Sequence, residues 1–129
     1  MKHIFNASNN AEAATRKEAW GSLLWLANQE IGNANGLTLG RVIIKSGQSN
    51  PRHAHFGCEE VLCLLHGKLR HTVGDDTYVM EPGDTLTILP GVFHNAASIG
   101  DVDADMIVAY SAGSRDFRLE AEVCHEDRL

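Results

Sequence analysis

Short runs of apolar and β-branched residues recur along most of this chain, and each run is about as long as a typical strand. They cover residues 20–27, 37–45, 59–65, 68–73, 77–80, 85–89, 92–99 and 104–110. The breaks between them are rich in Gly, Pro, Asn and Asp, which favour turns. This regular spacing predicts an all-β fold, a sandwich or a small antiparallel β-barrel.

The two ends of the chain lack this alternation. Residues 6–18 are rich in Asn, Ala and charge, and we expect an exposed helical turn there that includes Glu12, Arg16 and Lys17, with Ser8 or Asn10 as its cap. Residues 114–129 are charge-rich and leave three alternatives open: they wrap the barrel, add an edge strand or stay loose. We expect a single domain over 1–129, with a core barrel at about 20–112 and the terminal segments packed on it.

Size and charge narrow the classes of protein to consider. A chain of 129 residues and 14.1 kDa is large enough for one unaided core. The net charge of −6 opposes binding to nucleic acid, and no apolar run is long enough to span a membrane. The first residues do not read as a secretory signal, so a cytoplasmic location is expected. The three cysteines (Cys58, Cys63 and Cys124) are odd in number without a CxxC spacing, which favours reduced thiols.

Candidate metal ligands gather between Gly47 and Gly67. His53 and His55 are two residues apart, so on an extended strand their imidazoles point to the same side. Glu60 has the wrong parity for one straight strand, but a turn at residues 56–58 would bring its carboxylate back from a neighbouring strand. There it would be the only charged group among apolar neighbours, and burying it without a cation would be costly. One His-x-His pair is weak support for a metal site in a chain with seven histidines. The whole frame, meaning the spacing of the glycines and candidate ligands together, is harder to obtain by chance.

That frame runs from Gly47 through His53, His55 and Glu60 to Gly67, and then through Gly83 to His94. It resembles the two sequence motifs of the cupin superfamily, whose fold is a small antiparallel barrel, a double-stranded β-helix or jelly roll, with a metal site inside. The resemblance covers Gly47 to about Ser98 and implies four metal ligands: His53, His55, Glu60 and His94. It also implies strand-end turns at Gly47, Gly67 and Gly83, a Gly91 that shapes the approach to His94, and a Glu59 that faces away. Leu89 stands where the family usually has proline, and Ser98 where it usually has asparagine.

Three imidazoles and one carboxylate suit one divalent transition metal ion (Mn, Fe, Co, Ni, Cu or Zn) better than calcium. Four protein ligands on an octahedral ion leave two positions open for a small molecule. The sequence therefore predicts a metal-dependent enzyme of dioxygenase, decarboxylase, isomerase or lyase type acting on a small oxygenated organic compound, with Glu60 as a candidate acid or base. The alternatives are a non-catalytic metal-containing module that binds a small molecule or sugar, and a structural protein with an empty barrel.

The remaining candidates favour structural roles. His66 and His71 could orient a substrate, but exposed strand-end histidines are the more common case and are expected here. Cys58 is expected to be a small buried hydrophobe rather than a nucleophile. Trp20 and Trp25 are expected to pack or to contact another subunit. Tyr78, Tyr110 and Arg41 can reach the pocket only if their faces point inward, and Arg41 more often would be a surface charge. The family likeness also implies a homodimer.

Overall fold

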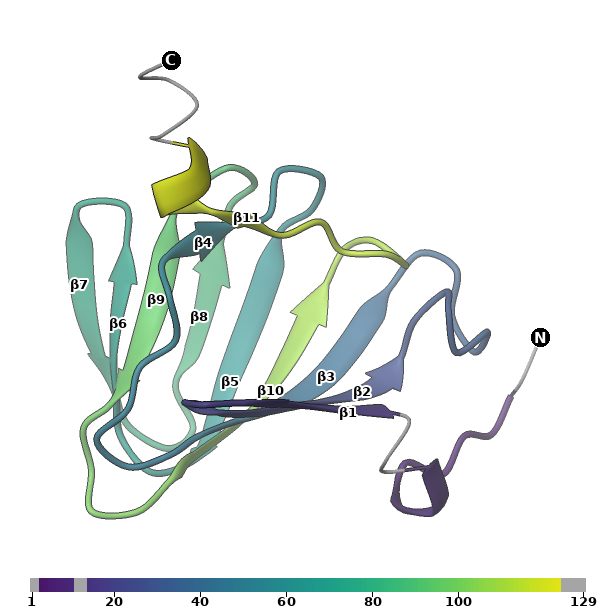
Figure 1. Ribbon diagram of the computed structural model, residues 1–129, viewed down its shortest axis with the longest axis horizontal. Coiled ribbons are helices and arrows are strands. Elements are labelled where there is room, and N and C mark those ends of the chain that lie inside the picture. Colours follow the sequence, from purple (N-terminus) through teal and green to yellow (C-terminus); the bar gives the residue numbers. More distant parts are fainter. Residues whose placement is uncertain (1–2, 11–13, 124–129) are drawn as a thin grey trace.

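The structure, a computed structural model, describes residues 3–10 and 14–123. Within these ranges the chain forms eleven strands in two antiparallel sheets (Figure 1). The six-stranded sheet has the order β1 (Thr15–Glu18), β2 (Gly21–Ala27), β3 (Thr38–Ile44), β10 (Ala104–Tyr110), β5 (Glu60–His66) and β8 (Thr85–Ile88). The five-stranded sheet has the order β11 (Arg118–Leu119), β4 (His53–Ala54), β9 (His94–Ser98), β6 (Leu69–Val73) and β7 (Asp76–Met80). The all-β expectation is confirmed.

The core lies between the inner faces of the two sheets. In β3, alternate residues are buried and the others are partly or fully exposed, as the apolar pattern predicted. The largest fully buried apolar side chains come from both sheets: Ile44, Leu62, Leu64 and Ile88 from the six-stranded sheet and Leu69 from the other. Gly67 allows the tight connection into β6, because its φ is 88° and an added Cβ would lie 2.8 Å from the Cα of Ala104.

The N-terminal expectation is wrong in part. A 3-10 helix at Ser8–Asn10 is present, but the Asn6 side chain caps it by accepting from the Ser8 amide at 2.9 Å. Arg16 and Lys17 belong to strand β1, which pairs with β2, and not to a helical turn. The pairing with β2 overrides the weak local preference of this polar segment. The remaining residue of that expectation, Glu12, lies outside the described residues.

The C-terminal segment resolves part of the open question about the tail. After β10 the chain crosses the rim of the barrel, and β11 then pairs with β4, beside the His-x-His pair (Figure 1). Residues 114–120, here called the closing segment, thus both wrap the barrel and add an edge strand. At its end the Glu120 amide donates to the Arg52 carbonyl at 3.1 Å, and the two side chains form an ion pair at 3.1 Å.

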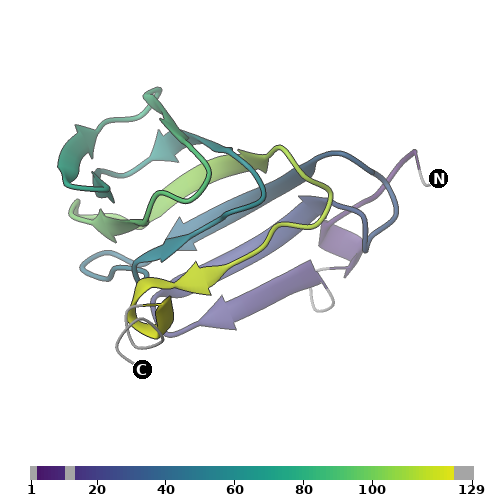
Figure 2. The same ribbon diagram turned by 90° about the horizontal axis from the view of Figure 1, so that it is seen from above.

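Seen from above, strands β1 and β2 and the hairpin formed by β6 and β7 lie at opposite sides of the molecule (Figure 2). The turn of that hairpin is at Gly74 and Asp75, where the sequence predicts it. In the part of the chain that the structure describes, no helix is long and apolar enough to cross a bilayer.

Candidate metal centre

The four predicted ligands come together inside the barrel from both sheets. His53 begins β4 and His94 begins β9, and the two are direct register partners in the five-stranded sheet. Glu60 begins β5 in the other sheet, so its carboxylate faces the imidazoles across the interior rather than from a neighbouring strand. The turn expected at residues 56–58 is what carries the chain from one sheet to the other.

The candidate ligand atoms of His53, His55, Glu60 and His94 all lie within 4.8 Å of one another, and all four residues are buried. Oε1 of Glu60 is 3.2 Å from Nε2 of His55 and 3.3 Å from Nε2 of His94. The neighbouring Glu59 is exposed, as expected from its place one residue away. Four donors that converge on one point in this way can hold a single metal ion.

Backbone carbonyls fix the orientation of all three imidazoles. In each ring Nδ1 donates a hydrogen bond, so the proton resides on Nδ1 and Nε2 keeps its lone pair. The acceptors for His53, His55 and His94 are the carbonyl oxygens of Pro51 (2.7 Å), Asp116 (2.6 Å) and Val92 (2.9 Å), respectively. Two of these acceptors lie two residues before their histidine, whereas Asp116 belongs to the closing segment.

The candidate ligand atoms lack partners that a bound cation would supply. Nε2 of His55, Nε2 of His94 and Oε1 of Glu60 are enclosed and have no hydrogen-bond partner. With the ring protons on Nδ1, the short contacts to Glu60 bring lone pairs together and are not hydrogen bonds. Buried ligand atoms that have no partner and repel one another destabilise the fold unless a positive ion lies between them. The residues present therefore fit a divalent transition metal.

The surroundings keep these groups in the protonation states that metal binding requires. Burial lowers the pKa of His53 to about 3, so this imidazole is neutral at neutral pH. Burial raises the pKa of Glu60, and the His55 and His94 side chains lower it only when they carry a proton on Nε2. When those nitrogens act as ligands, a bound cation would take over this role and keep the carboxylate ionised. Metal ligands must be deprotonated in this way.

His71 is the clearest error among the other candidates. It was expected at an exposed strand end, but it is 3% exposed and its ring stacks on that of His94, with centroids 5.8 Å apart. Burial lowers its pKa to about 4. The signal was present in the sequence, because His71 alternates with the buried Leu69 in one strand. His66, by contrast, is exposed as expected.

The remaining candidates differ in whether they lie beside the site. Tyr110 is buried beside the site, with its ring 5.0 Å from that of His55, and burial followed by the charge of Glu60 raises its pKa. Arg41 forms a paired contact with Asp105 outside the pocket, and Tyr78 is exposed. Among the described cysteines, Cys58 and Cys63 are free, and burial raises the pKa of the Cys58 thiol, which does not favour a nucleophile.

One departure from the family motif has a visible consequence. The hydroxyl of Ser98, at the position where asparagine is usual, is enclosed without a hydrogen-bond partner. Leu89, at the position where proline is usual, is 61% exposed and lies away from the ligands. Neither substitution disturbs the four candidate ligands.

No sequence pattern indicated the role that the closing segment plays at this site. The Asp116 carboxylate accepts hydrogen bonds from the amides of Phe56 at 2.6 Å and Gly57 at 2.8 Å. These contacts hold the segment against the turn that follows His55, while Phe117 stacks on the His53 ring with centroids 4.7 Å apart. Such long-range contacts leave no periodic pattern in a sequence.

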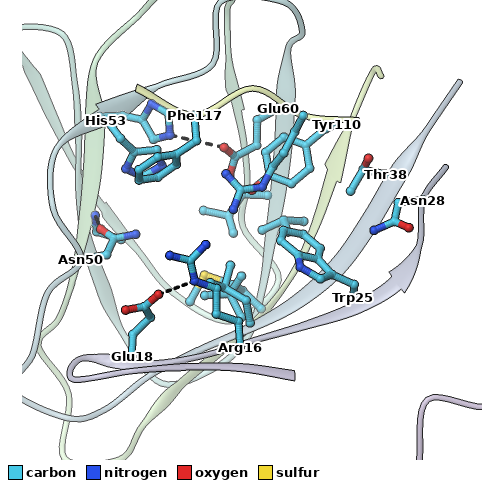
Figure 3. A pocket seen from close by; sticks show the side chains of 18 of the residues that line it. Arg16, Glu18, Trp25, Asn28, Thr38, Asn50, His53, Glu60, Tyr110 and Phe117 are labelled. Atoms are coloured by element: carbon cyan, nitrogen blue, oxygen red, sulfur yellow. Dashed lines mark hydrogen bonds and ion pairs between the residues drawn. The ribbon is translucent and has the colours of Figure 1, made fainter. Parts of the chain in front are cut away.

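The candidate centre opens into a pocket of about 670 Å³. His53, Glu60, Tyr110 and Phe117 lie on one side of this space and the pair formed by Arg16 and Glu18 on the opposite side (Figure 3). Trp20 and Trp25, expected to pack, do lie against the core, but they also line the pocket. A small molecule can therefore reach the candidate centre through a cavity of the size that binds ligands.

The sequence of this chain matches a known protein family and curated relatives. Residues 40–110, more than half of the chain, match the model of the Cupin domain family. Germin-like protein 3-5 of Oryza sativa subsp. japonica is 30% identical over 88 residues, which cover 62% of this chain and 39% of that protein. The chain thus spans about two-fifths of the length of this curated relative.

Solved structures agree at the level of the fold. A recombinant oxalate oxidase in complex with glycolate superimposes with a TM-score of 0.73 at 21% identity, covering 80% of this chain and 56% of the other. A formate complex of Lactobacillus farciminis oxalate decarboxylase does so with a TM-score of 0.78 at 16% identity, covering 87% and 35%. With the match over residues 40–110, these observations lead to one conclusion: the chain belongs to the cupin family.

Proposed function

We propose that this protein is a metal-dependent enzyme that acts on a small oxygenated organic compound. In this proposal His53, His55, Glu60 and His94 hold one divalent transition metal ion (Mn, Fe, Ni, Co, Cu or Zn). One observation carries the proposal: enclosed donors without partners converge on a point that opens into a pocket. A purely structural ion would be closed off by protein ligands, whereas this one would face a cavity.

A bound ion would supply Lewis-acid polarisation of an oxygen group or a binding position for dioxygen. The chain's own residues then orient the compound and move protons. Glu60 is the candidate acid or base, because its carboxylate can accept a proton when it is detached from the ion. The raised pKa of Tyr110 keeps its phenol protonated, so it can donate a hydrogen bond.

The neighbours in fold support small oxygenated compounds as the substrate class. The solved oxalate oxidase holds glycolate, and the solved oxalate decarboxylase holds formate. Oxidation and decarboxylation are therefore among the reaction types to test first, together with isomerase and lyase chemistry. The alternative is a non-catalytic module that binds a small molecule or sugar in the same pocket.

The test combines metal analysis with turnover. Protein purified without a histidine tag should contain about one ion per chain by mass spectrometry, and a His53→Ala/His55→Ala variant should contain almost none. A panel of small acids and sugars then separates the two candidate functions, because an enzyme turns one of them over and a binding module does not. Absence of metal even after reloading would contradict the metal-dependent enzyme and leave a binding barrel as the better account.

We also propose a cytoplasmic homodimer. Free thiols at Cys58 and Cys63 suit a reducing compartment. The outer face of β5 exposes Val61 (36%) and Leu65 (40%), an apolar strip that a second copy can cover. Light scattering coupled to size exclusion tests the dimer, and a Leu65→Glu variant should shift it toward monomer.

A further inference from the structure

The closing segment brings a positive charge to the pocket. Arg115 lines the pocket. The Cζ atom of its guanidinium lies 4.8 Å from the ring centroid of Trp25, 5.4 Å from that of Tyr110 and 5.3 Å from that of Phe117. Two of these rings also contact candidate ligands, since Phe117 stacks on His53 and Tyr110 meets His55 edge to face. The guanidinium therefore lies one aromatic ring away from two of the candidate ligands, in the same pocket.

Arg115 has no anionic partner in residues 3–10 and 14–123. Its Nε is enclosed by protein atoms and makes no hydrogen bond. Three other arginines form ion pairs: Arg16 with Glu18, Arg41 with Asp105 and Arg52 with Glu120. A buried donor without an acceptor costs about 1–3 kcal/mol. The three rings stabilise the charge of Arg115 but supply no acceptor for its N–H groups.

The pocket has room for an anion at this place. Its remaining charged lining residues are Glu18, Glu30, Glu60 and the already paired Arg16. One unpaired guanidinium matches one carboxylate, which it can bind with two parallel hydrogen bonds. A more highly charged group such as a phosphate would call for further cations, and the described lining offers none that is unpaired.

The rest of the lining is mixed, and its apolar part indicates an apolar portion of the ligand. The apolar part includes Leu23, Val42, Ile44, Leu62, Met106 and Val108. The volume of about 670 Å³ exceeds what a molecule of two or three heavy atoms would need. We infer that Arg115 binds a carboxylate of the substrate, while a second oxygen group of the same molecule reaches the metal and an apolar body lies against these side chains. The inference rests on the proposed function, because the second group needs an ion at the centre.

Ligand binding tests this without any assay of turnover. Zn²⁺-loaded protein is titrated by calorimetry with linear dicarboxylates from oxalate to adipate, each compared with its half-amide. The half-amide leaves one carboxylate for the metal and presents a neutral amide to Arg115. At the chain length that spans the two sites, we expect the wild type to prefer the dicarboxylate about 10- to 100-fold, the range expected for charge-assisted hydrogen bonds.

Arg115→Met should abolish this preference, and Arg115→Lys should retain a part of it, because lysine keeps the charge but not the planar fork. Arg16→Gln is the matched control, since Arg16 lines the same pocket but is paired with Glu18 at 2.6 Å; its preference should equal that of the wild type. A preference that survives in folded, Zn²⁺-loaded Arg115→Met, or no preference in the wild type at any chain length, would overturn the inference and leave Arg115 as a clamp for the closing segment. If Arg115→Met does not fold, an undiminished preference in Arg115→Lys overturns it.

Metal content, measured first on the same samples, separates this inference from the proposed function. If the wild type binds no Zn²⁺, the proposed function fails. The comparison is then made on metal-free protein with butyrate and butyramide, where only Arg115 is engaged. A preference for butyrate that Arg115→Met removes still supports carboxylate binding by Arg115, and its absence contradicts it.

Discussion

Two regions of the barrel meet at the candidate metal centre and are built in different ways. The ligand wall, residues 47–98, places its side chains through regular strands and turns, so His53 and His94 face each other as register partners. The closing segment, residues 114–120, has only the two-residue strand β11, and side-chain contacts hold the rest of it in place. The wall supplies the metal donors, whereas the segment orients one donor and supplies the charge that selects the ligand. Metal binding and substrate choice are thus assigned to different parts of the chain.

Removal of a donor from the wall should have the largest effect. Glu60→Gln keeps the shape of the side chain but removes its negative charge, so the metal content should fall from about one ion per chain to almost none. Glu59→Gln is the control, because Glu59 is exposed and faces away. Elemental analysis after dialysis and reloading measures both. A full complement of metal in Glu60→Gln would remove Glu60 from the ligand set.

Acid should lower the free energy of unfolding of the metal-free protein through buried histidines of the ligand wall. Burial lowers the pKa of His53 to about 3 and that of His71 to about 4, both below the value of about 6.5 in the unfolded chain. Between these values the unfolded state binds more protons, so the free energy of unfolding should decrease as the pH falls below 6.5. The expected slope is about 1.4 kcal/mol per pH unit for each such histidine.

Urea denaturation of chelator-treated protein from pH 7.5 to 4.5 measures this slope. His71→Leu should reduce the slope by the contribution of one histidine, about 1.4 kcal/mol per pH unit. His66→Leu, at an exposed position, should leave the slope unchanged. Equal slopes in the wild type and His71→Leu would show that His71 does not titrate in this way.

Release of the closing segment should weaken the centre without abolishing it. Asp116→Ala removes the acceptors for the amides of Phe56 and Gly57 and loosens the carbonyl that orients His55. Metal affinity should fall about 10-fold, as it does when other residues that orient a metal ligand by hydrogen bonding are changed. Asp101→Ala, on an exposed loop, is the control in a competition titration with a chelator. An unchanged affinity in Asp116→Ala would show that the segment does not support the centre.

A further comparison concerns the aromatic support of Arg115. In Gly40→Ala the new Cβ would lie 2.9 Å from Cε3 of Trp25, so the ring must shift. Overpacking of this kind costs about 1–3 kcal/mol, which thermal unfolding detects, and the tryptophan fluorescence should change as well. Gly36→Ala, where no atom lies within 4 Å of the added Cβ, should have neither effect.

Strand alternation and motif spacing allowed most of the ligand wall to be predicted. The strands containing Leu62 and Val42 were found because period-2 burial leaves a mark in the sequence. The convergence of His53, His55, Glu60 and His94 was expected from the resemblance of their spacing to the cupin motifs. The prediction missed that Glu60 comes from the opposite sheet, since spacing alone does not say which strands pair.

The rest of the structure depends on tertiary contacts that local sequence does not encode. Arg16 and Lys17 are in a strand because β2 offers them an edge, although their composition suggested a helical turn. Asp116 is tied to amides about sixty residues earlier in the chain, and no local pattern marks that pairing. His71 was a different kind of error, because its alternation with Leu69 was legible and the preference for exposed histidines was given too much weight.

The hydrogen bond from His55 to the Asp116 carbonyl spans 61 positions of the chain, and this has a consequence for biosynthesis. During translation the chain emerges from its N-terminus, so His53 and His94 can find their local carbonyls before residue 116 has emerged. His55 acquires its acceptor only after that. A nascent chain stalled before residue 116 emerges should therefore capture metal more weakly than a chain that has emerged beyond it.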